Sequence, residues 1–181
     1  MARVTRWAHF PQPEDRRENT LTHSLDSVIL AAVMLKIEDE QGIGLQLDHA
    51  KILLAAAIHD FGEGTIGDVT YRFKNDPRVH DAIETIEKEE VEKIFTNLSS
   101  SIREIFLQAY GVVDEKSLEG EFFNAIERIG YIFYAITQLE AGDQNFLEVF
   151  HRQNPKLVEL GKRFVSVRIL YLDLYEEYIK F

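Results

Sequence analysis

An adjacent histidine and aspartate, His59 and Asp60, stand at the end of the apolar run KILLAAAI, directly before the glycine-rich segment FGEGTIGD. Both side chains are ligands for divalent metals, and charges in apolar surroundings are costly unless a cation or a reaction uses them. Two more acids, Glu63 and Asp68, follow in the glycine-rich segment. The doublet therefore predicts half of a metal site.

The remaining ligands must come from other parts of the chain, because two neighbouring side chains cannot fill a metal's coordination shell. We pair His23 with the doublet, since it lies early on an expected helix near the apolar stripe; a histidine bonded to a backbone carbonyl is the alternative. If that helix packs antiparallel against the one ending at His59, the two sites meet. Glu127, within the apolar stretch FFNAIERIGYIFYA, is a fourth candidate. A pair with a neighbouring cation on the same helix, or with Lys or Arg of another helix, explains Glu127 equally well.

Two other patterns around the doublet carry less weight. His80-Asp81 repeats the dipeptide in the first turn of a polar helix, where an acid complements the helix dipole, so we expect it on the surface. Residues 62–67 match the dinucleotide pattern GxGxxG. We reject a dinucleotide site, because that pattern requires a preceding strand, whereas this segment follows an alanine-rich helix. Its glycines instead permit a tight turn that points Glu63 and Asp68 back toward the metal.

Helices are the elements expected to position these residues. Apolar side chains spaced three and four residues apart indicate amphipathic helices, whose ends are marked by Asp, Pro and Gly. Glycine and proline are sparse and no pair of runs alternates as a hairpin would, so the sequence predicts an all-α bundle of about five to seven helices. The expected helices cover residues 20–40, 48–60, 77–97, 101–110, 119–141 and 155–181. In the first helix the expected core-facing stripe is Leu21, Leu25, Val28, Ile29, Ala32, Val33 and Ile37.

Composition narrows the classes of function. With 181 residues and 45% hydrophobic content, one domain over residues 1–181 is expected, its first 18 residues forming an irregular arm. The net charge of -11 argues against binding to duplex nucleic acid or to an anionic membrane. The absence of cysteine leaves any metal to His, Asp and Glu. The first residues have no apolar leader region and no uncharged run has the length of a membrane span, so a cytoplasmic protein is expected.

These pieces, in this order, resemble the HD-domain metal-dependent phosphohydrolases, and most closely the HD-type 5′-deoxynucleotidases and the oxetanocin-resistance-like proteins. The resemblance covers about residues 4 to 150. It is carried by a set of short motifs: Arg6-Trp7, Glu18-Asn19, Thr22-His23-Ser24-Leu25, His59-Asp60 with Glu63, Gly67-Asp68, and Ala141-Gly142. The chain departs from the family at Glu127, where Asp is usual, and at Thr22, where Glu is common.

The resemblance implies an HD-domain bundle and a role for each site residue. The implied metal ligands are His23, His59, Asp60 and Glu127. Glu63 would act as the acid/base group, with Asp68 close to the substrate. Arg6 and Trp7 of the N-terminal arm would contact the nucleotide. The cofactor would be one divalent ion, with Mn²⁺, Co²⁺, Zn²⁺, Fe²⁺ and Mg²⁺ as candidates.

The function expected from the resemblance is metal-dependent removal of the 5′-phosphate from (deoxy)nucleoside monophosphates. Two alternatives stay open: hydrolysis of another phosphate ester, such as a signalling nucleotide or a phosphorylated metabolite, and nucleotide binding by a degenerate, non-catalytic HD protein. A small-molecule nucleotide is the expected partner. The relatives and the aromatic C-terminal helix also suggest a homodimer.

Overall fold

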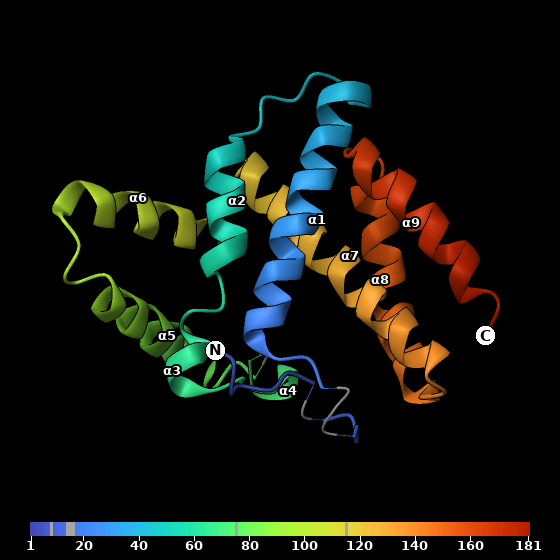
Figure 1. Cartoon of the computed structure of the whole chain (residues 1–181), viewed down its shortest axis with the longest axis horizontal. Coiled ribbons are helices and arrows are strands. Elements are labelled where there is room, and N and C mark those ends of the chain that lie inside the picture. Colours follow the sequence, from blue (N-terminus) through green and yellow to red (C-terminus); the bar gives the residue numbers. More distant parts are fainter. Residues whose placement is uncertain (8, 14–16, 75, 115) are drawn as a thin grey trace.

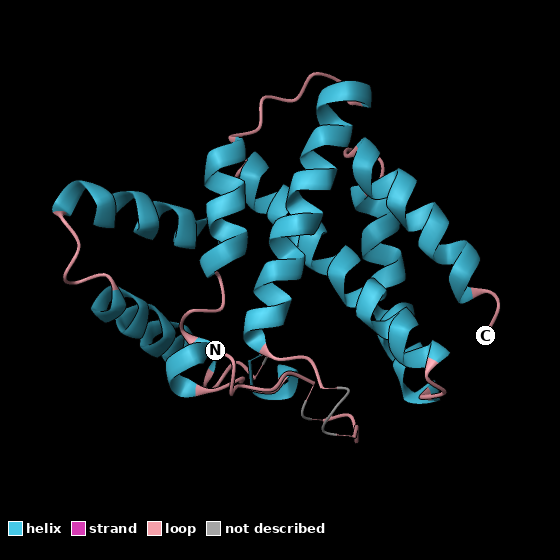
Figure 2. Ribbon diagram, viewed as in Figure 1, coloured by secondary structure: helices cyan, strands magenta, loops and turns pink. Residues whose placement is uncertain are grey.

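Helices form all the regular elements in the computed structural model, which describes residues 1–7, 9–13, 17–74, 76–114 and 116–181 (Figure 2). The predicted all-α class is confirmed, and seven of these helices have ten or more residues. In chain order the α-helices are α1 (Thr20–Gln41), α2 (His49–Ile58), α3 (Glu63–Ile66), α4 (Tyr71–Lys74), α5 (His80–Ile94), α6 (Ser100–Tyr110), α7 (Leu118–Glu140), α8 (Leu147–Leu160) and α9 (Val165–Tyr178). Two 3-10 helices, η2 (Gly111–Asp114) and η3 (Gln144–Phe146), flank α7.

The centre of the bundle is α7, which packs against α1, α2, α8 and α9 (Figure 1). Its apolar side chains recur at three- and four-residue spacing, so that one broad face enters the core. Phe122, Ile126, Ile129 and Ile132 on this face are fully buried. Because Glu127 follows Ile126 directly, the same packing that buries α7 fixes the carboxylate in the interior.

The antiparallel packing of α1 and α2 places the beginning of α1 beside the end of α2 (Figure 1). Asn19 caps α1 by accepting hydrogen bonds from the backbone of Leu21 and Thr22, and Asp48 caps α2, as predicted, by accepting one from Lys51. The N-terminal arm joins the same end of the bundle through a backbone bridge between Thr5 and Asn19. Residues far apart in the sequence therefore meet at one end of these two helices.

The core-facing stripe predicted for α1 is wrong in most of its members. Four of its residues, spaced four apart, are 46–60% exposed and form what we call the outer stripe of α1: Leu21, Leu25, Ile29 and Val33. The buried face instead carries small and polar residues, including His23, Ser24, Ser27 and Ala31. This difference has a physical reason. The face of α1 that packs against α2 and α7 carries His23 and its polar neighbours, so it cannot be uniformly apolar.

By length and hydropathy alone, α1 is also a candidate membrane span, although it includes charged residues such as Asp26 and Lys36 and so is not an uncharged run. It has 22 residues, and 39% of its most apolar window is buried inside the protein. Ala31, Met34 and Leu35 from this helix belong to the main hydrophobic core. Those contacts are typical of a core helix, which passes the same length and composition test.

Three predicted boundaries differ from the structure. The helix expected from Pro77 begins at His80, because Asp76 forms a turn by accepting bonds from the Arg78 backbone and guanidinium; Asn75, part of the expected cap, lies outside the described residues. The glycine-rich segment, expected as a loop, contains the helical turn α3. The C-terminal helix expected over 155–181 is two helices, with Pro155 inside α8 and a break before Val165.

The aromatic C-terminal segment, which suggested a homodimer, packs Phe164, Val167 and Tyr171 into the main core of the protein.

Candidate metal centre and active-site cavity

Three side chains from three helices converge at the junction of α1, α2 and α7. One ligand atom each from His23, His59 and Glu127 lies within 4.8 Å of the others. His23 Nε2 is 3.2 Å from Glu127 Oε2, and the two imidazole rings are 5.1 Å apart, centroid to centroid. Asp60 adds a carboxylate 3.4 Å from His59 Nε2 and 3.8 Å from His23 Nε2. The structure therefore brings together all four residues expected to bind metal.

Two hydroxyl groups orient the carboxylate of Glu127. Tyr131, four residues later on α7, donates its hydroxyl to Oε2 at 3.2 Å, and Ser27 of α1 donates to Oε1 at 3.0 Å. Burial would raise the pKa of Glu127, yet the adjacent His23 and His59 hold it well below its usual range. Burial likewise opposes the charge of His23, but Glu127 raises the pKa of this histidine to about 10. Among the residues that the structure describes, the ion pairs of Glu127 are with His23 and His59 and not with Lys or Arg.

The donor set fits a divalent cation, and the clearest sign is an unsatisfied atom. His59 Nε2 is buried without a hydrogen-bond partner, whereas buried polar atoms are normally paired. It faces a carboxylate oxygen of Asp60 and one of Glu127, the latter 3.5 Å away. His59 Nδ1 lies 3.0 Å from the carbonyl oxygen of Ala56, which is the arrangement that orients metal-binding imidazoles. Two imidazoles with two carboxylates suit zinc, manganese, cobalt and iron.

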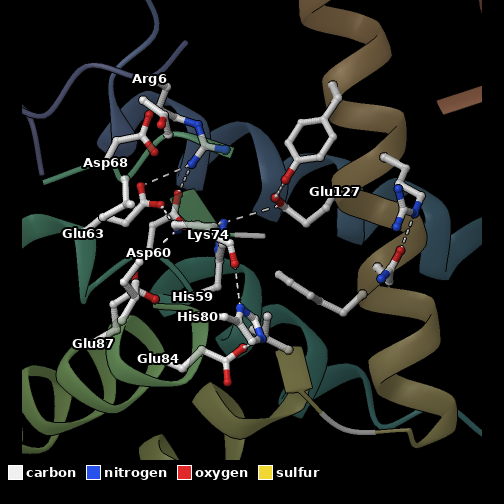
Figure 3. Close-up of a pocket in the computed structure, with 18 of the residues that line it drawn as sticks. Arg6, His59, Asp60, Glu63, Asp68, Lys74, His80, Glu84, Glu87 and Glu127 are labelled. Atoms are coloured by element: carbon white, nitrogen blue, oxygen red, sulfur yellow. Dashed lines mark hydrogen bonds and ion pairs between the residues drawn. The ribbon is translucent and has the colours of Figure 1, made fainter. Parts of the chain in front are cut away.

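Arg6 enters this cluster from the N-terminal arm. Its guanidinium donates to Asp60 and also lies 3.5 Å from Glu63 (Figure 3). The guanidinium is 3.4 Å from Glu18 as well. Burial would lower the pKa of Arg6, but Asp60 and the other carboxylates hold it well above the usual range. A buried, fixed cation of this kind has the chemistry to bind an anionic group in an otherwise acidic cavity.

Glu63, the first residue of α3, is the buried acid beside the cluster. Its Oε1 accepts a 2.7 Å bond from Lys74, while its Oε2 has no hydrogen-bond partner (Figure 3). Burial, and next the charge of Asp60, raise the pKa of Glu63 to about 7, although Lys74 acts in the opposite direction. A carboxyl group with this pKa exchanges protons near neutral pH, as a general acid or base must. Asp68 is half-buried nearby, and burial raises its pKa.

One cavity of about 740 Å³, a volume typical of ligand pockets, is lined by most of these residues: Arg6, His59, Asp60, Glu63, Asp68, Lys74 and Glu127. His23 contacts this lining through Glu127. Trp7 forms part of its wall, with the indole stacked on Tyr134 at 5.2 Å and Nε1 donating to Glu18 at 2.8 Å. Its φ of 61° lies in the left-handed region that bulky residues avoid, so surrounding contacts hold this conformation in place. His80-Asp81 is exposed, as expected, but it lines the rim of this same cavity.

The sequence analysis assigned no role to four residues that contact the site: Ser27, Lys74, Tyr131, and Glu18, which it named only within the motif Glu18-Asn19. Ser27 and Tyr131 follow His23 and Glu127 by four residues, and this helical spacing is a signal that could have identified them. Lys74 reaches Glu63 across a segment with no helical register, so no pattern in the sequence connects the two. Glu18, which lies 3.4 Å from His23 Nδ1, precedes the cap of α1 and has no apolar lead-in.

The chain is similar over residues 1–177 to a family described as 5′-deoxynucleotidase YfbR-like. An HD-domain phosphohydrolase from Listeria innocua has a similar structure, with a TM-score of 0.77, 14% identity, and coverage of 98% of this chain and 84% of that one. A conserved hypothetical protein from Pyrococcus furiosus is similar with a TM-score of 0.62 and 21% identity, over 90% of this chain and 84% of that one. A "predicted metal-dependent phosphohydrolase" from Magnetospirillum magnetotacticum is similar with a TM-score of 0.63 and 17% identity, over 89% of this chain and 79% of that one. No curated protein matches the sequence.

Proposed function

Because the chain belongs to the 5′-deoxynucleotidase YfbR-like family, whose HD fold it shares, we propose that this metal-dependent phosphohydrolase removes the 5′-phosphate from deoxynucleoside monophosphates. The observation that carries the proposal is the cluster of His23, His59, Asp60 and Glu127, the last three of which line a cavity together with Arg6 and Glu63. The cluster supplies metal ligands, and the two neighbouring residues supply a phosphate-binding cation and a proton donor.

We assign the divalent ion to His23, His59, Asp60 and Glu127. When bound there, it would supply Lewis-acid chemistry, which favours attack of water on a phosphate ester. Glu127 would have to replace the aspartate usual in the family, and the bonds from Ser27 and Tyr131 support that assignment by aiming its carboxylate at both histidines. Mn²⁺, Co²⁺, Zn²⁺, Fe²⁺ and Mg²⁺ remain candidates for its identity.

The residues around the metal ligands handle the substrate. Arg6 binds phosphate oxygens and offsets their charge, while Trp7 presents an aromatic surface to the sugar or base. Glu63, in its protonated form, donates a proton to the departing sugar oxygen, so that the leaving group departs as a neutral alcohol. Asp68 orients the substrate at the mouth of the cavity.

The test replaces the carboxyl group of Glu63 by an amide of similar size, which cannot donate the acid proton. Glu63→Gln should lower kcat for deoxynucleoside 5′-monophosphates by about 10²- to 10⁴-fold. Its metal content, measured by elemental analysis, should match the parent, because Glu63 is not among the proposed ligands. Glu92→Gln, on the exposed surface of α5, is the matched control and should retain parental kcat. An unchanged rate in Glu63→Gln would contradict the assignment.

We further propose that the protein is a homodimer through the outer stripe of α1. A two-fold axis allows one helix face to cover its own copy, and four exposed aliphatic side chains in a row are otherwise unfavourable in water. Sedimentation should therefore give a dimer for the parent and a monomer for Leu25→Glu. Ile86→Glu, at a similarly exposed apolar position on α5, should remain dimeric; a monomeric parent would exclude this interface.

The proposed compartment is the cytoplasm, where nucleoside monophosphates arise and are consumed. Cell fractionation followed by immunodetection would test this assignment, and recovery of the protein in the membrane fraction would contradict it.

A further inference from the structure

Lys74, the last residue of α4, lies between two carboxylates that come from different elements. Its ammonium nitrogen Nζ donates to Glu63 Oε1 at 2.7 Å and lies 3.4 Å from Glu87 Oε1 on α5 (Figure 3). Burial would lower the pKa of Lys74, but Glu63 and Glu87 hold it well above its usual value. The side chain therefore stays charged at neutral pH, and the two acids share that charge.

Helix α5 holds Lys74 at its backbone as well as at its ammonium group. The ring of His80, the first residue of α5, donates from Nδ1 to the carbonyl oxygen of Lys74 at 2.6 Å (Figure 3). Farther along the same helix, Glu87 Oε1 is buried with no hydrogen-bond partner among the described residues, and its ion pair with Lys74 offsets the buried charge. Two contacts from one helix therefore fix where this lysine lies.

The same helix packs directly against the turn that carries Glu63. A Cβ atom on Gly62 would lie 3.0 Å from Glu87 Cβ and 3.3 Å from Glu87 Cα, so α5 approaches the backbone closely at the residue before Glu63. A side chain at position 62 would push α5 away. Backbone packing therefore sets the spacing between Glu63 and Glu87, and Lys74 bridges it.

The two oxygens of the Glu63 carboxyl group have different surroundings. Oε1 accepts from Lys74, whereas Oε2 is buried with no hydrogen-bond partner in the part of the chain that the structure describes. An ammonium group cannot accept a hydrogen bond, so an acid proton on Oε1 would point at a cation. Arg6 lies 3.5 Å from Oε2 but makes its hydrogen bond to Asp60. The proton of the acid form therefore belongs on Oε2.

We propose that Lys74 is a positioning residue of the reaction: held by α5, it binds Glu63 Oε1 and thereby keeps Oε2, the oxygen that gives up the proton, directed at the substrate. This role rests on the proposed function of Glu63 as the acid. Direct contact of Lys74 with the substrate phosphate is the competing role, because Lys74 also lines the cavity. The geometry favours positioning, since two carboxylates already share the ammonium group.

Steady-state kinetics with 2′-deoxyadenosine 5′-monophosphate and Mn²⁺ separates the two roles. Lys74→Met should lower kcat by about 10- to 100-fold and leave KM within about twofold, because a displaced acid costs rate and not binding. Lys74→Arg, which keeps a charged donor, should recover part of kcat. Lys88→Met removes an exposed lysine from the same cavity lining and should keep parental kcat. A KM raised about tenfold in Lys74→Met, with kcat unchanged, would assign Lys74 to phosphate binding and overturn the proposal.

A double-mutant cycle with Glu63→Gln shows whether Lys74 acts through the acid. In the Glu63→Gln background, Lys74→Met should change the residual kcat by less than about twofold, because the proton that Lys74 positions is already absent. Losses of kcat that multiply would overturn the proposal. Glu87→Gln should cause a smaller loss of kcat that also disappears in the Glu63→Gln background. This variant carries the test if thermal melting shows that Lys74→Met does not fold.

The outcomes for Lys74 and for the proposed function are separable. A parent that hydrolyses no deoxynucleoside monophosphate contradicts the proposed function, whereas an active parent, an impaired Glu63→Gln and multiplying losses contradict the positioning role alone. Equilibrium binding of the monophosphate to Mn²⁺-loaded Glu63→Gln needs no turnover, and its affinity should be the same with and without Lys74→Met. Binding about tenfold weaker in the double variant would make Lys74 a phosphate ligand and overturn the positioning role.

Discussion

At the residue scale, neighbouring charges and burial give Asp60 and Glu63 different pKa values. Asp60 has a pKa below its usual range, because His59 and Arg6 outweigh its burial. Glu63 has a pKa raised to about 7 by its burial and by the charge of Asp60. One carboxylate therefore stays ionised for a metal, while the other holds a proton near neutrality. This difference in environment is what separates a ligand from a proton donor.

The pH dependence of the reaction should report the pKa of Glu63. If the protonated carboxyl group is the active form, kcat/KM should fall as pH rises through about 7. Because the folded pKa is raised above the ordinary value of 4.5, Glu63 also favours folding most below pH 4.5, and that contribution is lost as pH approaches 7.

Two measurements on Glu63→Gln check this assignment. The limb of the pH–rate profile near pH 7 should be absent from its residual activity. The variant should also gain stability relative to the parent between pH 4.5 and 7, measured by chemical unfolding at each pH. A limb that persists in the variant would assign the titration to another group.

At the scale of elements, α1 makes polar contacts with other helices near both of its ends. Its beginning carries His23, and near its other end Glu38 reaches the start of α9. Glu38 Oε1 accepts bonds of 2.7 Å from both the backbone nitrogen and the hydroxyl of Ser166. The residue before α9, Phe164, provides no side-chain cap. A buried carboxylate from one helix thus replaces the missing cap of another.

Removal of the contact between Glu38 and Ser166 should destabilise the protein, and neither residue lines the cavity. Glu38→Ala leaves the Ser166 donors buried and unpaired, which should lower the free energy of unfolding by about 2–3 kcal/mol. Glu40→Ala removes an exposed acid that pairs with Lys36, and should change stability by less than about 0.5 kcal/mol. Urea unfolding of both variants measures the difference; equal stabilities would show that Glu38 does not act as a cap.

At the scale of the whole molecule, the proposed metal ligands connect three helices of the bundle. His23 belongs to α1, His59 and Asp60 follow α2, and Glu127 belongs to α7. A cation bound by all of them stabilises the folded state and not the unfolded chain, in which the ligands are far apart. Metal binding should therefore be visible as thermal stability.

Saturating Mn²⁺, at about 100 times its Kd, should stabilise the parent by about 2.7 kcal/mol. For a chain of this size the increase in Tm should be about 5–10 °C. Glu127→Ala should lose most of this increase, whereas Glu127→Asp, with a shorter carboxylate, should keep part of it. Scanning calorimetry with and without metal provides the measurement. A parental increase that survives in Glu127→Ala would exclude this residue as a ligand.

The fold and the metal-ligand cluster could be predicted where the signal is local or repeated. Helical spacing and caps located α1, α2 and α7 well, and the apolar setting of His59-Asp60 distinguished it from His80-Asp81. The break before α9 was missed because the buried positions Leu157 to Leu174 keep their spacing across it. The partner of Glu63 was missed because Lys74 approaches it through tertiary folding, which no local pattern records.

The hydrogen bond between Ser27 and Glu127 joins residues separated by 100 positions, and the contact of Arg6 with Asp60 spans 54. During synthesis from the N-terminus, the arm, α1 and α2 emerge well before α7. A nascent chain that ends before residue 127 therefore holds three of the four proposed ligands and lacks the carboxylate of Glu127. If all four residues are needed, metal binding has to wait until α7 has been synthesised.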